Sequence, residues 1–411
     1  MTILGSLPPL LRDDPAVAGV LGAGSGVVAI PEPARAFVLA GLASLSGRGP
    51  FVVAVPTTTD AERLAHDLRA YLGDDAVEAF PAWETLPFER VSPSVETMGR
   101  RLRVMWRLRV GARGRPERMP RVLVAPIRAL CQRLGPHVED VEPVTVAPGQ
   151  QVEVDDLVER LVRAGYRREY QVEHRGELAV RGSIVDVFPS TADGPVRIDL
   201  WGDEVDRLTE FAVADQRSTA DLAGVEIFGA RELLPSEEVR ARAAALVGAE
   251  PWGREQWERL AEGQTFEGME SWLPWLTDGE HLVLDLVGPD AQVVLVEPRR
   301  MRDRATEILD EEESLATTLA QTWGARPQGG ADGDGGGGAG FPRLHLPFDR
   351  LLAHTRAPAW TVANAPEGPG TAAVSAAGWD PVVGDGTRLV KQLAELRADG
   401  YRVVVCADGR G

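Results

Sequence analysis

The chain has 411 residues with 62 acidic and 44 basic side chains, so its formal net charge is −18 at neutral pH. This length is too great for one ordinary hydrophobic core, and the 44% hydrophobic and 26% charged content is typical of globular proteins. No apolar run approaches the roughly 18 residues of a membrane-spanning helix. The negative net charge opposes a general attraction to nucleic-acid phosphates. We therefore expect several domains, no membrane partner and no broad nucleic-acid surface.

Few residues suit disulfide, metal or nucleotide chemistry. Cys131 and Cys406 lie far apart, which indicates reduced thiols in a cytoplasmic protein. The six histidines are scattered and share no ligand spacing with either cysteine, so we expect no metal site. Lys391 is the one lysine of the sequence and is not followed by Ser or Thr. A nucleotide-binding P-loop needs Gly-Lys-Ser/Thr, so a standard P-loop is excluded.

Helix and strand patterns alternate over the first 135 residues. The glycine-rich segment 16–30 predicts a loop, because no convincing strand precedes it and no acidic residue follows at the distance that a dinucleotide site requires. The pattern then predicts helices at 33–46, 59–72, 95–110 and 127–133 and strands at 51–55, 77–80 and 121–124. Thr59 or Asp60 can cap the second of these helices. This alternation indicates a parallel sheet covered by helices.

The rest of the chain changes character several times. Strand patterns and a helix at 155–164 dominate residues 136–212, and helices with Trp-rich turns dominate 213–323. The latter region contains predicted buried strands at 281–286 and 292–296 and a helix at 298–320. The composition of 324–340 predicts a flexible linker. A helix at 386–399 and a strand at 402–406 predict the start of a further α/β domain in 341–411, within a longer protein.

Two residue clusters are interpreted as structural. The helix at 95–110 predicts a solvated face with ion pairs rather than a DNA contact, because its arginines recur at helical spacing: Arg100, Arg101, Arg103, Arg107 and Arg109. Core packing is also favoured over base stacking for four tryptophans without interleaved basic residues: Trp252, Trp257, Trp272 and Trp275.

Residues 176–211 carry the most specific pattern. They predict a meander of three short strands, with one extended run over 178–187 and turn signals at 193–194 and 202–203. Between 196 and 201 apolar residues alternate with Arg197, Asp199 and Trp201, so one face is buried and the other carries a cation, a carboxylate and an indole. Taken alone, such a polar face is most often solvated surface.

Three stretches of the sequence resemble a known family. GELAVRGSIVDVFPS at 176–190 and VRIDLWGDEVDRL at 196–208 resemble a segment shared by the excision-repair helicase UvrB and the bacterial transcription-repair coupling factors. PAWETLPFERVSPS at 81–94 resembles the coupling-factor version. The resemblance implies an α/β fold: a degenerate helicase-like parallel-sheet lobe (1–135 and 213–323) with an inserted α+β domain (136–212).

For the lobe, the resemblance places Ala34 and Arg35 where UvrB carries the Lys-Thr of its P-loop. The arginine fork does not fit the lysine slot, and alanine has no hydroxyl for a magnesium ion. The tyrosine-rich hairpin with which UvrB clamps DNA has no counterpart, because 81–110 contains no tyrosine. The resemblance thus implies a non-catalytic segment without a cofactor, ATP and magnesium belonging to motor domains beyond this chain.

For the inserted domain, the resemblance implies docking to the UvrA repair ATPase through Arg167, Arg181, Phe188, Arg197 and Asp199. It implies RNA polymerase and DNA as partners through downstream domains, in a family whose full-length members are ATP-dependent translocases that displace stalled RNA polymerase. Local alternatives are that Arg181 pairs with Glu177 or Asp186 and that Phe188 is core. The alternative functions are a divergent UvrB-like ATPase and a direct DNA-binding module.

Overall fold

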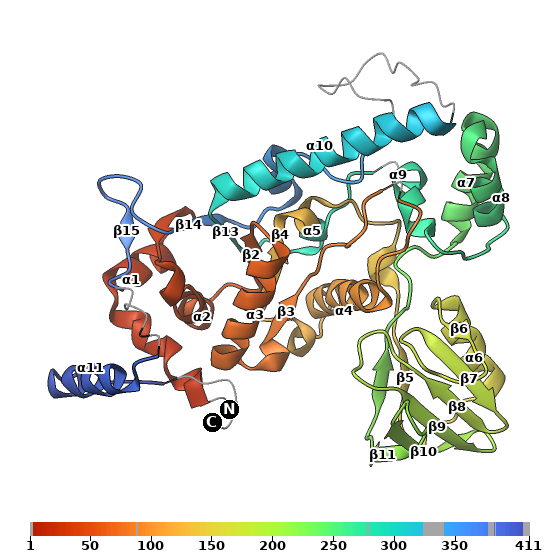
Figure 1. The fold of residues 1–411 in the computed structure, drawn as a ribbon, viewed down its shortest axis with the longest axis horizontal. Helices are drawn as coiled ribbons and strands as arrows, with labels where there is room; N and C mark the ends of the chain where they lie inside the picture. The colour runs from red at the N-terminus through yellow and green to blue at the C-terminus, as the bar shows by residue number, and fades with distance from the viewer. Residues whose placement is uncertain are drawn as a thin grey trace.

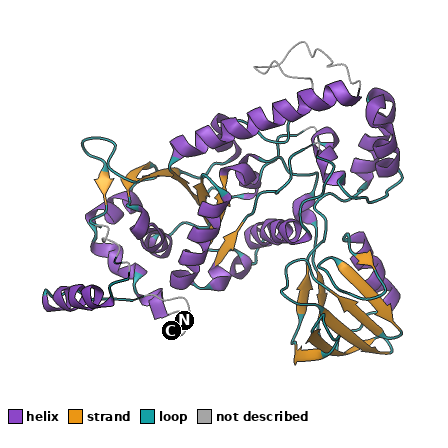
Figure 2. Cartoon of the chain, viewed as in Figure 1, coloured by secondary structure: helices purple, strands orange, loops and turns teal. Residues whose placement is uncertain are grey.

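The computed structural model describes residues 3–87, 89–277, 279–323, 341–376, 382 and 384–405. Within them the chain forms a seven-stranded, a six-stranded and a two-stranded sheet. Figures 1 and 2 show the large sheet among helices and the six-stranded sheet projecting from it. This is the mixed α/β architecture predicted from the sequence. The predicted linker, 324–340, lies outside the described residues.

The large sheet is parallel at every neighbouring pair, in the order β15-β1-β14-β13-β2-β4-β3. Its strands are β1 (Gly26–Ala29), β2 (Phe51–Val55), β3 (Val77–Ala79), β4 (Val122–Pro126), β13 (Gln292–Val296), β14 (Ala359–Ala363) and β15 (Ala372–Ala373). Every residue of β2 is buried, with Val52 and Ala54 in one core and Val53 and Val55 in the other. A strand covered on both faces requires this continuous apolar run.

Helices cover both faces of this sheet (Figure 1). One core is closed by α1 (Pro15–Gly22), α2 (Arg35–Leu45) and α3 (Thr58–Leu72), and the other by α4 (Val95–Ala112), α5 (Ile127–Cys131) and α10 (Pro298–Trp323). The helices predicted at 33–46, 59–72, 95–110, 127–133 and 298–320 are thus confirmed. The cap of α3 is Thr57, whose hydroxyl oxygen accepts from the Asp60 amide at 3.2 Å, and not Thr59 or Asp60.

The sheet joins segments from both sides of 324–340. β14 lies between β1 and β13, and β15 pairs with the other edge of β1. Residues 359–373 therefore complete this lobe, which corrects the prediction that a further domain starts at 341. The reason is that an inner strand needs hydrogen-bonding neighbours on both sides, which sequence pattern does not identify. The predicted helix at 386–399 is confirmed as α11 (Gly386–Ala398), but residues 402–405, predicted as strand, form no regular structure.

Two further local predictions were wrong. The segment 16–30 is not a loop but contains α1 and β1, and Asp14 caps α1 by accepting from the amides of Ala16 and Val17 at 2.9 and 3.0 Å. The predicted strand at 281–286 is instead the 3₁₀ helix η9 (Val283–Leu286). There the Asp285 carboxylate accepts from the Leu282 amide at 2.7 Å, a local bond that competes with extended structure.

The second unit spans the strands from β5 to β12. Its elements are β5 (Val144–Val146), α6 (Val154–Arg163), β6 (Arg167–Arg168), β7 (Glu177–Arg181), β8 (Ile184–Val187), β9 (Val196–Trp201), β10 (Glu204–Phe211), β11 (Ser218–Asp221) and β12 (Val225–Ile227). The predicted three-strand meander has four strands, because Gly182, at φ +63°, turns the chain between β7 and β8. The unit continues past 212, since β12 pairs with β5 and Ile227 lies in its core.

The remaining helices surround four tryptophans. They are α7 (Glu237–Ala249), α8 (Arg254–Ala261) and α9 (Leu273–Leu276), together with the 3₁₀ helices η7 (Pro251–Gly253) and η8 (Met269–Trp272), which contain Trp252 and Trp272. The other 3₁₀ helices lie elsewhere along the chain: η1 (Ile3–Ser6), η2 (Pro8–Asp13), η3 (Glu32–Ala34), η4 (Asp74–Ala76), η5 (Pro116–Arg118), η6 (Val138–Asp140) and η10 (Phe348–His354). Trp257 is fully buried, and its ring centroid lies 4.8 Å from that of Trp272. The packing interpretation of these tryptophans is confirmed.

A buried ion pair ties α4 to the segment between β12 and α7, through which the chain leaves the second unit. Arg101 is fully buried, and its Nε and Nη2 donate to the Glu232 carboxylate at 2.7 and 3.0 Å. The Trp83 indole donates to the same carboxylate at 2.8 Å. Arg103 and Arg107 pair with Glu78, as the predicted ion-pair pattern requires. Arg101, however, does not belong to a solvated face.

Candidate functional site

The outer face of the six-stranded sheet brings together most of the predicted docking residues. Opposite residues in an antiparallel pair share a face, and the register pairs Asp186 with Arg197 and Ile184 with Asp199. Arg181 lies opposite Ile184 in the neighbouring pair. The β7–β8 hairpin and the antiparallel pairing of β8 with β9 therefore align side chains from these three strands on one surface.

An aspartate missed by the site prediction organises this face. Asp186 is 0% exposed and accepts from Nε and Nη2 of Arg197 at 2.7 and 2.9 Å. Nη2 of Arg181 donates to the same carboxylate. The local alternative for Arg181, pairing with Asp186, is thus what the structure shows. The signal in the sequence was an acid flanked by two valines, five residues after Arg181.

Arg197 and Arg181 differ in how much of each side chain remains exposed. Nη1 of Arg197 donates to the Gln216 carbonyl at 3.1 Å, and its guanidinium lies 4.8 Å from the centroid of the Phe211 ring. The bond to Asp186 raises the pKa of Arg197. Only 16% of the Arg197 side chain is exposed, against 45% for Arg181. Arg197 therefore mainly holds the face together, whereas Arg181 can also meet a partner.

The other three predicted residues also differ in how exposed their side chains are. Arg167, on the edge strand β6, lies opposite Glu177 and is 3.8 Å from its carboxylate, with most of the side chain exposed. Asp199 is half-buried, and burial raises its pKa although Arg197 lowers it. Phe188 is only 7% exposed and packs with Phe211 in a small apolar cluster, which supports its core alternative.

The helicase-like lobe has the strand-turn-helix geometry of a nucleotide site, but its side chains differ from those of a P-loop. Arg35, the first residue of α2, follows β1 and donates to Glu297 at 2.7 Å and to Asn364 at 2.6 Å. Although burial raises the pKa of Glu297, hydrogen bonds from Arg300 and Arg35 hold it below its ordinary value. Arg35 thus links the ends of three parallel strands, β1, β13 and β14. Ala34, beside it, offers no polar side-chain group.

A cavity of 270 Å³ adjoins this arginine. Its charged lining is mixed, with Arg35 and Arg63 against Glu32, Asp60 and Asp67. A triphosphate needs a cluster of donors and a metal-binding hydroxyl. The excess of carboxylates repels such an anion, so the residues present do not fit ATP.

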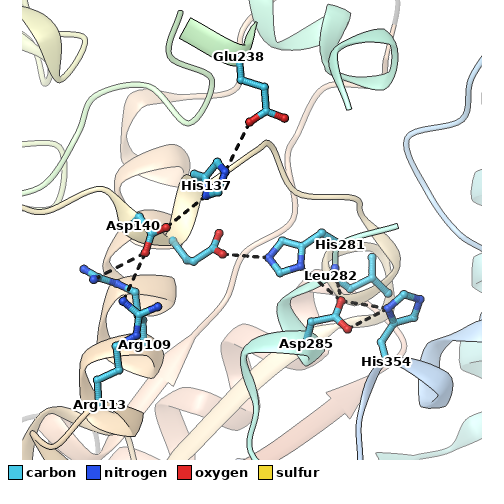
Figure 3. A network of polar contacts seen from close by, with 10 residues as sticks. Arg109, Arg113, His137, Asp140, Glu238, His281, Leu282, Asp285 and His354 are labelled. Carbon is cyan, nitrogen blue, oxygen red and sulfur yellow. Dashed lines mark hydrogen bonds and ion pairs between the residues drawn. The ribbon is translucent and has the colours of Figure 1, made fainter. Parts of the chain in front are cut away.

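A chain of histidines and carboxylates joins η6, η9 and η10 (Figure 3). His281 lies 3.4 Å from Glu139 and 3.6 Å from Asp285, and His354 lies 3.0 Å from the same Asp285. The contact between His281 and Glu139 raises the pKa of His281 and lowers that of Glu139. Among the described residues no group of three or more such side chains is placed to hold a metal ion. The network instead ties together three segments that are distant in sequence.

In the described part of the chain, no helix is both long and apolar enough to cross a membrane. The long helix α10 is therefore not a candidate membrane span. Its exposed side carries ion pairs, such as that of Arg304 with Glu307 at 2.8 Å.

Comparison with known proteins connects this geometry to a family. The model of the UvrB interaction domain matches residues 144–233, the unit that bears the outer sheet face. Transcription-repair-coupling factors are similar over longer stretches. That of Mycobacterium tuberculosis is 37% identical over 81% of this chain and 28% of the relative. Those of Myxococcus xanthus and Escherichia coli are 35% and 31% identical over 66% and 55% of this chain, which is 24% and 19% of the relatives.

The match thus spans between about a fifth and a little more than a quarter of the length of these curated relatives. The match includes the UvrB interaction domain and extends well beyond it on the chain, since that domain model ends at residue 233 and the alignment covers 348 residues. The sequence resemblance is therefore confirmed. The chain belongs to the transcription-repair-coupling factor family and carries a UvrB interaction domain.

Proposed function

We propose that this chain is a non-catalytic module that recruits the UvrA repair ATPase to stalled RNA polymerase in nucleotide-excision repair. The observation that carries the proposal is the single sheet face on which Arg181, Arg197 and Asp199 meet, inside the matched UvrB interaction domain. Exposed guanidinium groups suit protein docking, because they present several donors in a planar fork. RNA polymerase and DNA would be engaged by translocase domains outside this chain. The proposal places the chain in the cytoplasm, where Cys131 and Cys406 stay reduced.

Binding of purified UvrA to Arg181→Ala tests this function. We expect affinity to fall by about 1–3 kcal/mol, the range of a charged interface contact, with an unchanged melting temperature. The matched control is Arg163→Ala, which removes the same charge from α6, an exposed position of the same domain. If Arg181→Ala binds UvrA like the parent, the docking face lies elsewhere.

The absence of ATP chemistry is also part of the proposal. It is supported by the Arg35–Glu297 pair at the strand ends and by the carboxylate-rich lining beside it. Titration of the 411-residue chain with Mg-ATP should release no binding heat. Micromolar binding with turnover would instead favour the alternative of a divergent ATPase.

A further inference from the structure

One large apolar side chain stands on the outer sheet face without a role so far. Trp201 follows Asp199 by two residues on β9, so both side chains point to the same side. The Trp201 side chain is 83% exposed. Exposing an indole forfeits the free energy of burying one of the largest apolar surfaces among the amino acids.

The register places this indole at the hairpin end of the face. Trp201 lies opposite Glu204, across the turn that begins at Gly202. On its other side the Leu200 amide donates to the Ser183 carbonyl, in the turn that joins β7 to β8. Arg181 is the last residue of β7 before that same turn. Arg181 on β7 and Trp201 on β9 therefore lie at the same end of one sheet face, with β8 between them.

The opposite end of the sheet is fixed to the lobe. Ser190, just beyond β8, packs against α4 so closely that a Cβ added at Gly99 would lie 2.2 Å from its hydroxyl oxygen. The Ser190 amide donates to the Tyr166 hydroxyl at 2.9 Å. Because the two hairpin turns lie at the far end of the strands, that end points away from the lobe, where a large partner can approach it.

We infer that Trp201 is an anchor of the docking surface and inserts into an apolar pocket of UvrA. This inference rests on the proposed function. Carboxylates at the rim of that pocket would pair with Arg181. Asp186 engages only one terminal nitrogen of this arginine, and 45% of its side chain stays exposed. Tryptophan and arginine are among the residue types in which interface hot spots are enriched.

The experiment measures binding of purified UvrA to the 411-residue chain by surface plasmon resonance. Trp201→Ala should weaken binding about 10- to 100-fold, as expected for a hot spot, and Trp201→Phe should recover part of the loss. The control is Val162→Ala, which trims an exposed apolar side chain on α6, the helix that covers the other face of the sheet. All three variants should melt at the parent temperature.

The outcomes separate this inference from the proposed function. If Trp201→Ala binds like the parent while Arg181→Ala binds weakly, the anchor role is refuted and UvrA docking stands. If Trp201→Ala weakens binding only together with a lowered melting temperature, the indole is structural and the inference is equally overturned. If the parent chain itself does not bind UvrA, the proposed function fails first.

Discussion

Replacing Arg101 with methionine removes the cation of the ion pair that joins α4 to Glu232. Methionine retains much of the apolar stem, so the loss is chiefly one of charge and hydrogen bonds. Glu232 would keep the Trp83 donor at 2.8 Å but lose both guanidinium bonds while remaining buried. A buried charge without its partner costs about 3–5 kcal/mol. The Pro81 carbonyl, which accepts from Arg101 at 2.9 Å, loses a donor at a further cost of about 1 kcal/mol.

Urea unfolding followed by circular dichroism would measure this loss in Arg101→Met, Glu232→Gln and the double variant. The neutral glutamine leaves Trp83 an acceptor, so the double variant should be less destabilised than the sum of the singles, by about 2 kcal/mol. Arg100→Met is the control, because Arg100 only approaches Glu96 at 3.8 Å on the surface and should lose less than about 1 kcal/mol. An Arg101→Met variant as stable as this control would refute the reasoning.

Four other substitutions test the fold. Gly268→Ala should prevent stable folding, because φ is +80° and a Cβ there would lie 2.2 Å from a backbone oxygen, whereas Gly248→Ala, with open space in α7, should raise the melting temperature slightly. Arg197→Ala should lower the free energy of unfolding by about 3 kcal/mol in urea titrations, since it strips a buried carboxylate of its main partner. His281→Gln should lower the free energy of unfolding most between about pH 4.5 and 6.5. The raised pKa of His281 contributes stability that is lost as the pH rises through that pKa. The lowered pKa of Glu139 contributes stability that is lost as the pH falls through that pKa. Equal losses at about pH 5.5 and pH 8.5 in thermal melts would contradict that pairing.

The sequence alone determined the elements whose signals lie within a few neighbouring residues. The apolar run 51–55 became β2, and the helical period after it became α3. The alternation from 196 to 201 correctly separated a buried face from a polar one, because side chains alternate strictly along a strand. The sequence motifs at 81–94 and 176–208 indicated the family without any knowledge of the fold.

Only the tertiary structure decided which of these elements meet. The place of β14 between β1 and β13, and the bond of Arg101 to a carboxylate 131 residues away, depend on chain segments that no local pattern connects. The same holds for the proposed docking face, where the buried Asp186 engages Arg197 while Arg181 and Trp201 stay exposed. Local periodicity fixes the face on which a side chain lies. Its partners and its burial depend on how distant strands register, and so on the packing of the whole chain.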